Sequence, residues 1–410
     1  MKNVVLNIHL IRNRMTELDL KQWWLAEQIG VDQKTVRRWL QGKIKQVKCE
    51  NAKALAEKLE CELDEIILST DEDLLATPED QKRAAELISS SQLMEKLGPI
   101  QEWDVLEALL KATIIPNLPA FVLGELYNKL AVACWRQSKI DQASVYADKA
   151  FELGQRINDK TTIANATLSQ ANIHSWRGET ADSIKKYELC LQLEKYLPDQ
   201  TLGSVYSNLG AILWEIGDLE SGLNTQLKAK KVFENHGTDM NRSICQAQLS
   251  FIYLENGEVG KAKEAAEQSL MLSDSASYKR GQCMGHLVLG EIAARMGETN
   301  TAKNKIKTGL EKFSELNIYE GFNFEFAGRT YRILGELEQA QEYLTEGLKY
   351  SEKFPVYLAA LYRELGIVLS EMGSKKNFAQ EYLSRSISIF ESVGAPIRAE
   401  QVKSIKKSYS

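Results

Sequence analysis

The side chains most able to do chemistry in this sequence are the basic ones near its N-terminal end. Residues 1–48 carry ten lysines and arginines against four acidic residues, a balance of +6, whereas the remaining residues carry a balance of −11. Ammonium and guanidinium groups gathered in this way neutralise phosphates. We therefore expect an N-terminal end that binds a polyanion, joined to a body that does not bind nucleic acid.

The other reactive side chains are too dispersed for catalysis or metal binding. The six cysteines include no C-x-x-C pair, and the four histidines lie far apart in the sequence. This spacing gives no zinc-ligand pattern and no disulfide framework. There is also no Ser/His/Asp or Cys/His pattern and no phosphate-binding loop. We predict no enzyme activity, no cofactor and no metal, and we expect free thiols that fill small spaces in a reducing cytosol.

Composition predicts an all-α fold. The chain is 44% hydrophobic and 26% charged, with only seven prolines among 410 residues, and long stretches are rich in good helix formers. That length suits two or three domains, or one small domain followed by a solenoid. No apolar run approaches the ~18 residues of a membrane span, and the start is too polar for a signal peptide. We predict a cytoplasmic protein with no membrane partner.

Residues 22–42 have the pattern of two short helices that meet at a glycine. Gly30 stands where the C′ glycine of a helix belongs, and Asp32 is placed to cap the next helix. The small side chain of Ala26 lets two helices cross closely, and Val36 supplies a buried β-branched contact. This pattern predicts a helix-turn-helix.

The same segment resembles the lambda-repressor/Cro-like (XRE-type) helix-turn-helix family. The residues that match the family pattern in register are Gln22, Leu25, Ala26, Gly30, Val31, Val36, Trp39 and Gly42. The likeness continues through 51–59 and 63–67, and so extends over most of the N-terminal end. It implies a small five-helix DNA-binding domain over residues 1–68.

The resemblance also implies which side chains contact DNA. In that family the second helix of the motif enters the major groove, and its first residues touch base edges. The residues implied for the groove are Gln33, Lys34, Thr35 and Arg38, with Arg37 beside the backbone or an outer base. Those implied for phosphates are Gln22, Lys43 and Lys45. The alternative is that the basic cluster is only a solvated face.

Trp23 and Trp24 depart from this family, which usually carries polar residues there. We expect that at most one of them turns toward the small core. An exposed tryptophan is costly to leave in water, so the hypothesis is that the other contacts the repeat domain or a second subunit.

A repeated unit follows an acidic linker at 69–80 and a helical pair at 81–119. Each unit has a small residue, then a glycine, then a second small residue, with a serine at the glycine position in the first unit and the last residue slipped by one in the seventh. The units begin at Ala131, Ala171, Gly210, Ser250, Gly290, Gly328 and Gly366, and their spacing is nearly constant. The pattern predicts one helix–turn–helix pair per unit, because small residues permit close helix contact and a glycine relieves the turn.

The units resemble tetratricopeptide repeats, whose usual period is about 34 residues, but the period here is longer, at about 40 residues. The longer period implies longer helices, in about seven repeats over residues 120–394, with a capping helix at 395–410. The resemblance implies a right-handed superhelix with a concave inner surface.

That resemblance also places particular side chains on the concave surface as candidates to bind an effector. They are Asn128, Trp135, Asn165, Asn172, Trp214, Phe251, Arg329, Arg332 and Arg363, together with Glu291, Phe322 and Glu325. Asparagine can pair with a peptide backbone, arginine with a carboxylate, and aromatic rings can form apolar pockets. The alternative is that the arginines pair with acids such as Glu325 and that Trp135 and Trp214 belong to the core between repeats.

A DNA-binding head joined to such repeats resembles the bacterial peptide-pheromone receptors that are transcription factors. The resemblance implies a homodimeric, quorum-sensing regulator whose affinity for a palindromic DNA site is set by a peptide or protein effector. The alternative is a tetratricopeptide interaction scaffold with a DNA-localising or protein-binding head. The +6 charge balance of residues 1–48 argues against a head that binds only protein.

Overall fold

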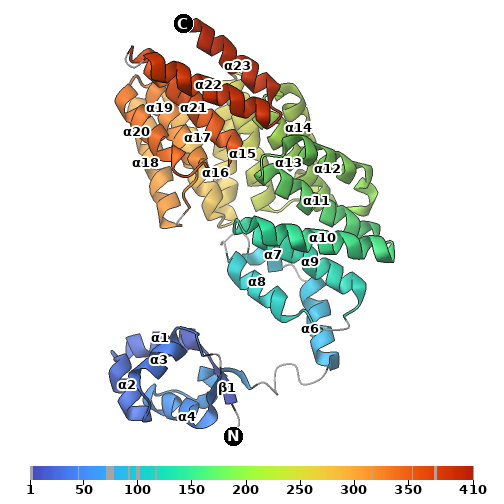
Figure 1. Ribbon diagram of the computed structural model, residues 1–410, viewed down its shortest axis with the longest axis vertical. Coiled ribbons are helices and arrows are strands. Elements are labelled where there is room, and N and C mark those ends of the chain that lie inside the picture. The colour runs from blue at the N-terminus through green and yellow to red at the C-terminus, as the bar shows by residue number, and fades with distance from the viewer. Residues whose placement is uncertain are drawn as a thin grey trace. The chain divides into compact units, whose positions relative to one another are not determined.

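The structure is a computed structural model that describes residues 3–44, 46–70, 78–90, 93–97, 102–115, 118–316, 318–352, 354–373 and 376–409. Helices make up nearly all of its regular structure, which confirms the predicted all-α fold (Figure 1). The chain divides into two compact units, Met1–Leu87 and Ile88–Ser410. Within the described ranges, no helix combines the length and apolar character that crossing a membrane requires.

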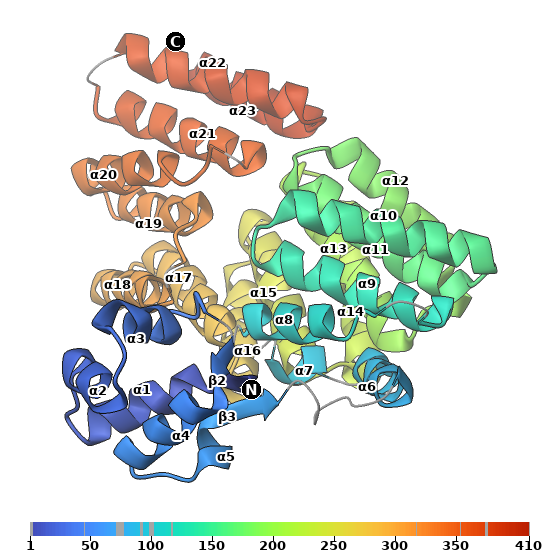
Figure 2. The same cartoon turned by 60° about the horizontal axis from the view of Figure 1, so that its bottom comes forward.

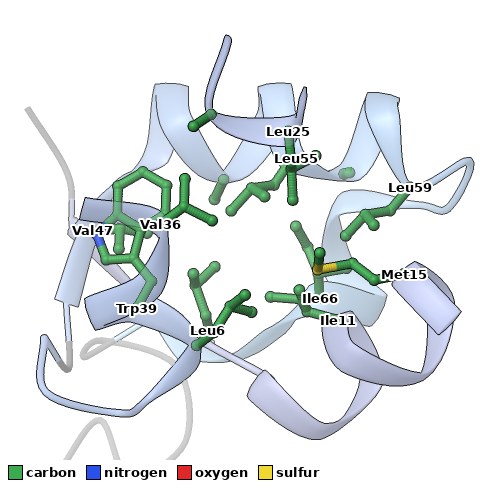
Figure 3. Close-up of a cluster of buried hydrophobic side chains, with 14 of the residues drawn as sticks. Leu6, Ile11, Met15, Leu25, Val36, Trp39, Val47, Leu55, Leu59 and Ile66 are labelled. Carbon is green, nitrogen blue, oxygen red and sulfur yellow. The ribbon is translucent and has the colours of Figure 1, made fainter. Parts of the chain in front are cut away.

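The N-terminal unit is built from five short helices around one apolar core. These are α1 (Ile8–Glu17), α2 (Gln22–Ile29), α3 (Gln33–Leu40), α4 (Cys49–Lys58) and α5 (Leu63–Ile66). Each contributes buried side chains to the core that Figure 3 shows, among them Ile11, Leu25, Val36, Leu55 and Ile66. The five helices agree with the bundle that the family resemblance implies.

A small sheet that the sequence patterns did not predict also belongs to this unit. It has three strands, β1 (Asn3–Leu6), β2 (Gln46–Lys48) and β3 (Ile67–Thr70), in the order β2-β1-β3. Both neighbours pair antiparallel with β1, whose Val4 lies opposite Val47 on one side and Thr70 on the other. The sheet joins segments from before α1, between α3 and α4, and after α5. Strand β3 therefore extends into the start of the segment predicted as a linker.

Helix α6 (Pro78–Ser90) contains the boundary between the units, and α7 (Leu93–Leu97) and α8 (Trp103–Ala112) follow it. Seven helix pairs then succeed one another. The pairs are α9 (Ala120–Arg136) with α10 (Ile140–Ile157), α11 (Lys160–Trp176) with α12 (Thr180–Gln192), α13 (Asp199–Glu215) with α14 (Leu219–His236), α15 (Asp239–Glu255) with α16 (Val259–Ser275), α17 (Lys279–Arg295) with α18 (Thr299–Glu315), α19 (Gly321–Ile333) with α20 (Leu337–Leu348), and α21 (Pro355–Glu371) with α22 (Lys376–Ser392). A 3-10 turn, η1 (Glu194–Tyr196), follows α12, and α23 (Pro396–Ser408) ends the array.

The pairs stack in chain order, as Figure 2 shows. The first helix of each pair contacts its own partner and also the first helix of the next pair. The first helices therefore line a common inner face, as expected for an α-solenoid. This confirms the predicted array of about seven long repeats.

The turn between the helices of each pair has the backbone conformation that its glycine predicts. The six turn glycines Gly178, Gly217, Gly257, Gly297, Gly335 and Gly373 have φ between +64° and +92°. Ser138, which replaces the glycine in the first unit, also has a positive φ of +59°. Residues that carry a side chain rarely adopt this backbone conformation. The turn therefore favours glycine, which explains why glycine recurs there.

The predicted small residues also lie where the paired helices touch. A Cβ atom on Gly328 would lie 2.3 Å from Cγ of Leu344 on the partner helix. In the second unit the Oγ of Ser183 donates a hydrogen bond of 2.7 Å to the carbonyl of Ala171. Larger side chains at these positions would push the two helices apart.

The last elements of the array return to its second and third pairs. The ring of Phe354 packs edge-on against Trp176 with 4.8 Å between centroids, and Tyr357 donates a hydrogen bond of 3.0 Å to the carboxyl of Glu215. From α23, the Arg398 guanidinium donates to the carbonyls of Trp214 and Glu215 at the end of α13. The inner face is therefore closed over by the array's own C-terminal helices.

Candidate nucleic-acid interface and repeat-array cavity

Local backbone chemistry positions α3, the helix expected to read DNA. Gly30 adopts a φ of +76°, and the N–H of Val31 donates to the carbonyl of Ala26, so α2 ends in a left-handed turn. Asp32 then caps α3, because its carboxylate accepts from the backbone N–H of Thr35 at 2.8 Å and from its hydroxyl at 2.6 Å. The predicted glycine turn and cap are both confirmed.

Helix α3 has one buried face and one exposed face. Val36, Trp39 and Leu40 are buried in the core of the N-terminal unit. A side chain from α1, that of Arg12, donates to the carbonyl of Leu40 and ties down the C-terminal end of α3. The core therefore fixes how the outer face is presented.

The side chains on that outer face are the ones that the family resemblance implies for DNA. Gln33, Lys34, Arg37 and Arg38 are exposed. In the described part of the chain, none of these four side chains has a hydrogen bond or an ion pair. Their charges and donors are available to phosphates and base edges.

Thr35 differs from its neighbours on α3. It is half-buried, and its hydroxyl hydrogen is engaged by the Asp32 carboxylate. These hydrogen bonds lower the pKa of Asp32. In this structure Thr35 holds the start of the helix, and its contact with a base stays a prediction.

The residues implied for phosphate contacts lie at the edges of the motif. Gln22 is exposed at the first position of α2, whose N-terminus receives no side-chain cap. Uncapped N–H groups at such a position favour a phosphate. Lys43 is exposed just after α3, and Lys45 lies outside the described residues.

The two adjacent tryptophans point in different directions. Trp24 packs against the core of the N-terminal unit, whereas Trp23 is 57% exposed. The expectation that at most one of them turns inward is confirmed. What covers Trp23 stays a hypothesis.

Residues on the inner face of the repeat array line a partly open cavity of about 700 Å³. Half of the side chains predicted to face an effector line this cavity, and they come from the first helices of four pairs, α9, α11, α15 and α19. They are Asn128, Trp135, Asn165, Asn172, Phe251 and Phe322. The structure thus brings together residues that are far apart in the sequence.

Two of these asparagines are held in place by hydrogen bonds from their neighbours. The Oδ1 of Asn172 accepts from the hydroxyl of Tyr187 at 2.5 Å and from the amide of Asn208 at 2.8 Å, which leaves its own N–H donors for a ligand. The amide of Asn128 donates to the carbonyl of Thr162 at 3.4 Å. Within the described ranges, the Oδ1 of Asn128 has no partner. Amide groups fixed in this way suit a peptide backbone.

Aromatic rings form one wall of the cavity. Trp135 packs edge-on against Trp176, which in turn meets Phe354, and Phe354 lies 6.3 Å from Tyr357 between centroids. Tyr357 continues the series to Phe322 at 5.2 Å. The series joins α9 and α11 to α19 and α21, so residues of the last two pairs complete one wall of the cavity.

The three arginines predicted to face an effector are instead joined to carboxylates. Arg329 pairs with Glu291 at 2.5 Å and with Glu325 at 3.1 Å. Arg363 bridges Glu325 and Glu364, and Arg332 pairs with Glu364 and Glu371. None of the three is among the residues that line the cavity. This is the ion-paired arrangement that the sequence left open as the alternative, and effector contact by these arginines stays a prediction.

Trp214 also lies away from the main cavity. It lines a small pocket of about 30 Å³ and packs against Phe251 with 5.3 Å between ring centroids. In the part of the chain that is described, its indole nitrogen has no hydrogen-bond partner. Its surroundings match the alternative of a core residue between repeats.

Several residues that line the cavity were not predicted from the sequence. Arg136, Glu215 and Arg280 sit at the ends of first helices, outside the positions that line a standard tetratricopeptide groove. Phe354 and Tyr357 reach the cavity only through the return of the last pair, which has no local signal. Burial raises the pKa of Glu215 to about 7 against the opposing effects of Tyr357 and Arg398.

Comparison with known families agrees with both parts of the chain. Residues 10–72 match the Cro/C1-type HTH DNA-binding domain, and residues 325–354 match the tetratricopeptide repeat. No curated protein matches the sequence. The two predicted resemblances are therefore confirmed: the chain combines a Cro/C1-type DNA-binding domain with tetratricopeptide repeats, neither of which is a catalytic kind of domain.

Solved structures show the same fold at low identity. The structure of a Rap protein complexed with competence and sporulation factor is 13% identical, covers 81% of this chain and 98% of its own, and has a TM-score of 0.54. The apo form of RapI is 13% identical over 66% of this chain and 96% of RapI, with a TM-score of 0.49. Bacillus thuringiensis PlcR in complex with the peptide PapR7 and DNA is 16% identical over 67% of this chain and 96% of PlcR, with a TM-score of 0.39. The first likeness shows the fold alone, and the other two are too loose to support an argument.

Proposed function

We propose that this chain is a sequence-specific transcriptional regulator whose repeat array binds a short peptide that controls DNA binding. The observation that carries the proposal is the exposed, unpaired set Gln33, Lys34, Arg37 and Arg38 in the described part of a Cro/C1-type domain. Arginine bidentate to guanine and glutamine bidentate to adenine are the pairings that such side chains favour in the major groove. Such a regulator works in the cytoplasm, where a bacterial genome is accessible.

The cavity of the array supports a peptide as the effector. Its volume of about 700 Å³ lies within the range of ligand pockets, roughly 300–1,000 Å³. Fixed amides such as Asn172 supply donors for a peptide backbone, and the wall from Trp135 to Phe322 supplies apolar surface for side chains. A peptide matches this mixture of polar and aromatic lining.

The closure of the array supplies a route for control. Phe354 and Tyr357 belong both to the cavity wall and to the contacts between the last pair and the second and third pairs. A peptide in the cavity would therefore touch the residues that make these contacts. A ligand shifts such an equilibrium only if it binds one arrangement better than the other. We propose that the peptide selects one curvature of the array and thereby the spacing of two DNA-binding domains in a homodimer, about 34–36 Å for half-sites one turn apart.

Genome-wide DNA enrichment with the purified full-length chain tests the DNA-binding part. The expected result is a small set of sites that share a palindromic sequence. Enrichment without a shared sequence would contradict sequence-specific regulation and would favour the interaction scaffold with a DNA-localising head.

The proposal that a peptide is the effector is tested by repeating the DNA enrichment in the presence of short peptides from cultures of the organism that makes this protein. The expected result is a change in site occupancy that the double variant Asn165→Ala/Asn172→Ala abolishes. Glu152→Ala on the exposed face of α10 is the matched control, because Glu152 does not line the cavity. An unchanged peptide response in the asparagine variant would remove the cavity as the effector site.

A further inference from the structure

Of the two arginines in the cavity wall, Arg280 has a carboxylate partner, and Arg136 has none among the described residues. Arg136 lies in the last turn of α9, is exposed and is among the residues that line the cavity. Its guanidinium carbon lies 4.4 Å from the ring centroid of Trp135 and 5.7 Å from that of Trp103. Among the described residues, Arg136 has no ion pair and no hydrogen bond.

Five other arginines of the array are neutralised by carboxylates within the structure. Each pairs with a carboxylate: Arg280 with Glu320, Arg329 with Glu291, Arg332 with Glu364, Arg363 with Glu325 and Arg398 with Glu255. Arg136 therefore stands apart as a cation whose planar group is oriented by two indole rings while its N–H donors are unused by the described residues. Stacking of this kind fixes the direction of the donors and reduces what is lost when they bind.

The remaining charges around the cavity do not neutralise Arg136. Desolvation by the surrounding protein lowers the pKa of Arg136, and the nearby Arg280 acts in the same direction. Of the three carboxyls that line the wall, Glu320 pairs with Arg280, and burial raises the pKa of Glu125 and that of Glu215. An anion placed beside Arg136 would relieve an uncompensated positive charge.

We infer that Arg136 is the anchor for a carboxylate of the bound peptide, held by two parallel N–H donors of the guanidinium beside the Trp135 ring. The inference rests on the proposed peptide-binding function and adds the chemical class that the peptide must carry. The carboxylate comes either from an aspartate or glutamate side chain or from the free C-terminus. Trp135, Trp176 and Phe354 then surround the apolar part of the same residue.

The test uses the full-length protein and two randomised pools of short synthetic peptides, one with a free C-terminal carboxylate and one amidated. Peptides retained by the immobilised protein are identified by mass spectrometry. A C-terminal anchor retains peptides from the free pool only, whereas a side-chain anchor enriches aspartate or glutamate at one position in both pools. Either result supports the anchor and identifies the source of the carboxylate.

Variants tie the carboxylate preference to this arginine. Arg136→Gln should abolish the preference and weaken a retained peptide by about 10- to 100-fold, the loss expected for hydrogen bonds to a charged group. Arg136→Lys keeps the positive charge but lacks the paired N–H donors. Its affinity for the peptide should lie between those of the parent and of Arg136→Gln. Arg156→Gln, an exposed position on α10 outside the cavity wall, is the matched control and should bind as the parent does.

The outcomes separate this inference from the proposed function. Retained peptides without any carboxylate preference, or equal binding by Arg136→Gln, overturn the anchor and leave the peptide receptor standing. If the parent protein retains no peptide from either pool, the proposed function fails and the anchor with it. Should Arg136→Gln fold poorly, the comparison of free and amidated pools on the parent and on Arg136→Lys still decides the question.

Discussion

The arginines of α3 and those of the repeat array share a side chain but have opposite surroundings. Arg37 and Arg38 are exposed and unpaired in the described part of the N-terminal unit. Arg329 and Arg363 are largely buried and held by the carboxylates of Glu291, Glu325 and Glu364. In the first region the charge has no partner among the described residues, and in the second it is neutralised within the fold. The neighbouring acids, more than the arginines themselves, decide between these roles.

The largest expected effect comes from breaking the ion pairs of the array. Glu291→Ala removes a fully buried carboxylate that both Arg329 and Arg295 contact, and it leaves the largely buried guanidinium of Arg329 paired with Glu325 alone among the described residues. Loss of one partner of a buried ion pair costs about 3–5 kcal/mol when the other charge is left alone. Because the pair with Glu325 remains, the free energy of unfolding of the array should fall by up to that amount in denaturant titrations. Exposed Glu152→Ala should change it by less than about 0.5 kcal/mol. Equal stability of the two variants would show that the array does not depend on these pairs.

The opposite behaviour is expected on α3. Arg38→Ala should leave stability nearly unchanged, because its side chain has no partner within the described residues. It should cost about 1–3 kcal/mol in binding to the enriched DNA site and relax specificity at one base pair. Binding measurements on sites substituted at each position check this. A uniform loss across all sites would move Arg38 from base contact to phosphate contact.

A second prediction for the N-terminal unit contrasts Lys43, expected at a phosphate, with Arg38, expected at a base. Lys43 is exposed after α3 and is expected to contact a phosphate. Lys43→Ala should weaken binding to all DNA sequences alike, and the slope of log K against log salt should become shallower by about one. Titrations of specific and non-specific DNA at several salt concentrations measure the slope. An unchanged slope would place Lys43 away from the DNA backbone.

Two carboxyls of the array, half-buried Glu215 and buried Glu364, have pKa values that shift in opposite directions. Burial raises the pKa of Glu215 to about 7, from an ordinary value of 4.5. Burial would also raise that of Glu364, but Arg363, Arg332 and Arg329 outweigh it and lower the pKa of Glu364. Between about pH 4.5 and 7 the folded state therefore holds a proton on Glu215 that the unfolded chain releases, so this group's contribution to stability declines as pH rises through that window.

Glu215→Gln tests that sign. The amide still accepts from the Tyr357 hydroxyl but cannot ionise, so the variant should lose less stability than the parent between pH 5 and 8. Thermal unfolding across this pH range, with both proteins in the same buffers, measures the difference. Parallel pH profiles for parent and variant would mean that Glu215 is charged in the folded protein at neutral pH.

Much of the fold could be predicted because its signals are local. A cap at Asp32 and glycines such as Gly30 and Gly178 are demanded by backbone conformation within a few residues. The recurrence of such positions at a nearly constant spacing identified the array. The β2-β1-β3 sheet escaped prediction because its strands are very short and pair across the whole N-terminal unit.

The sequence by itself determined where the helices begin and turn, which face of α3 is basic, and that the repeats stack. Only the tertiary structure decided which charges are free. Arg329 meets Glu291 from 38 positions away, Tyr357 meets Glu215 from 142 and Arg398 meets Trp214 from 184. Such contacts depend on how small rotations between successive pairs add up around the array, and no local pattern encodes that sum. Among the described residues, Arg136 has no carboxylate partner, and it lines the cavity to which the returning last pair contributes.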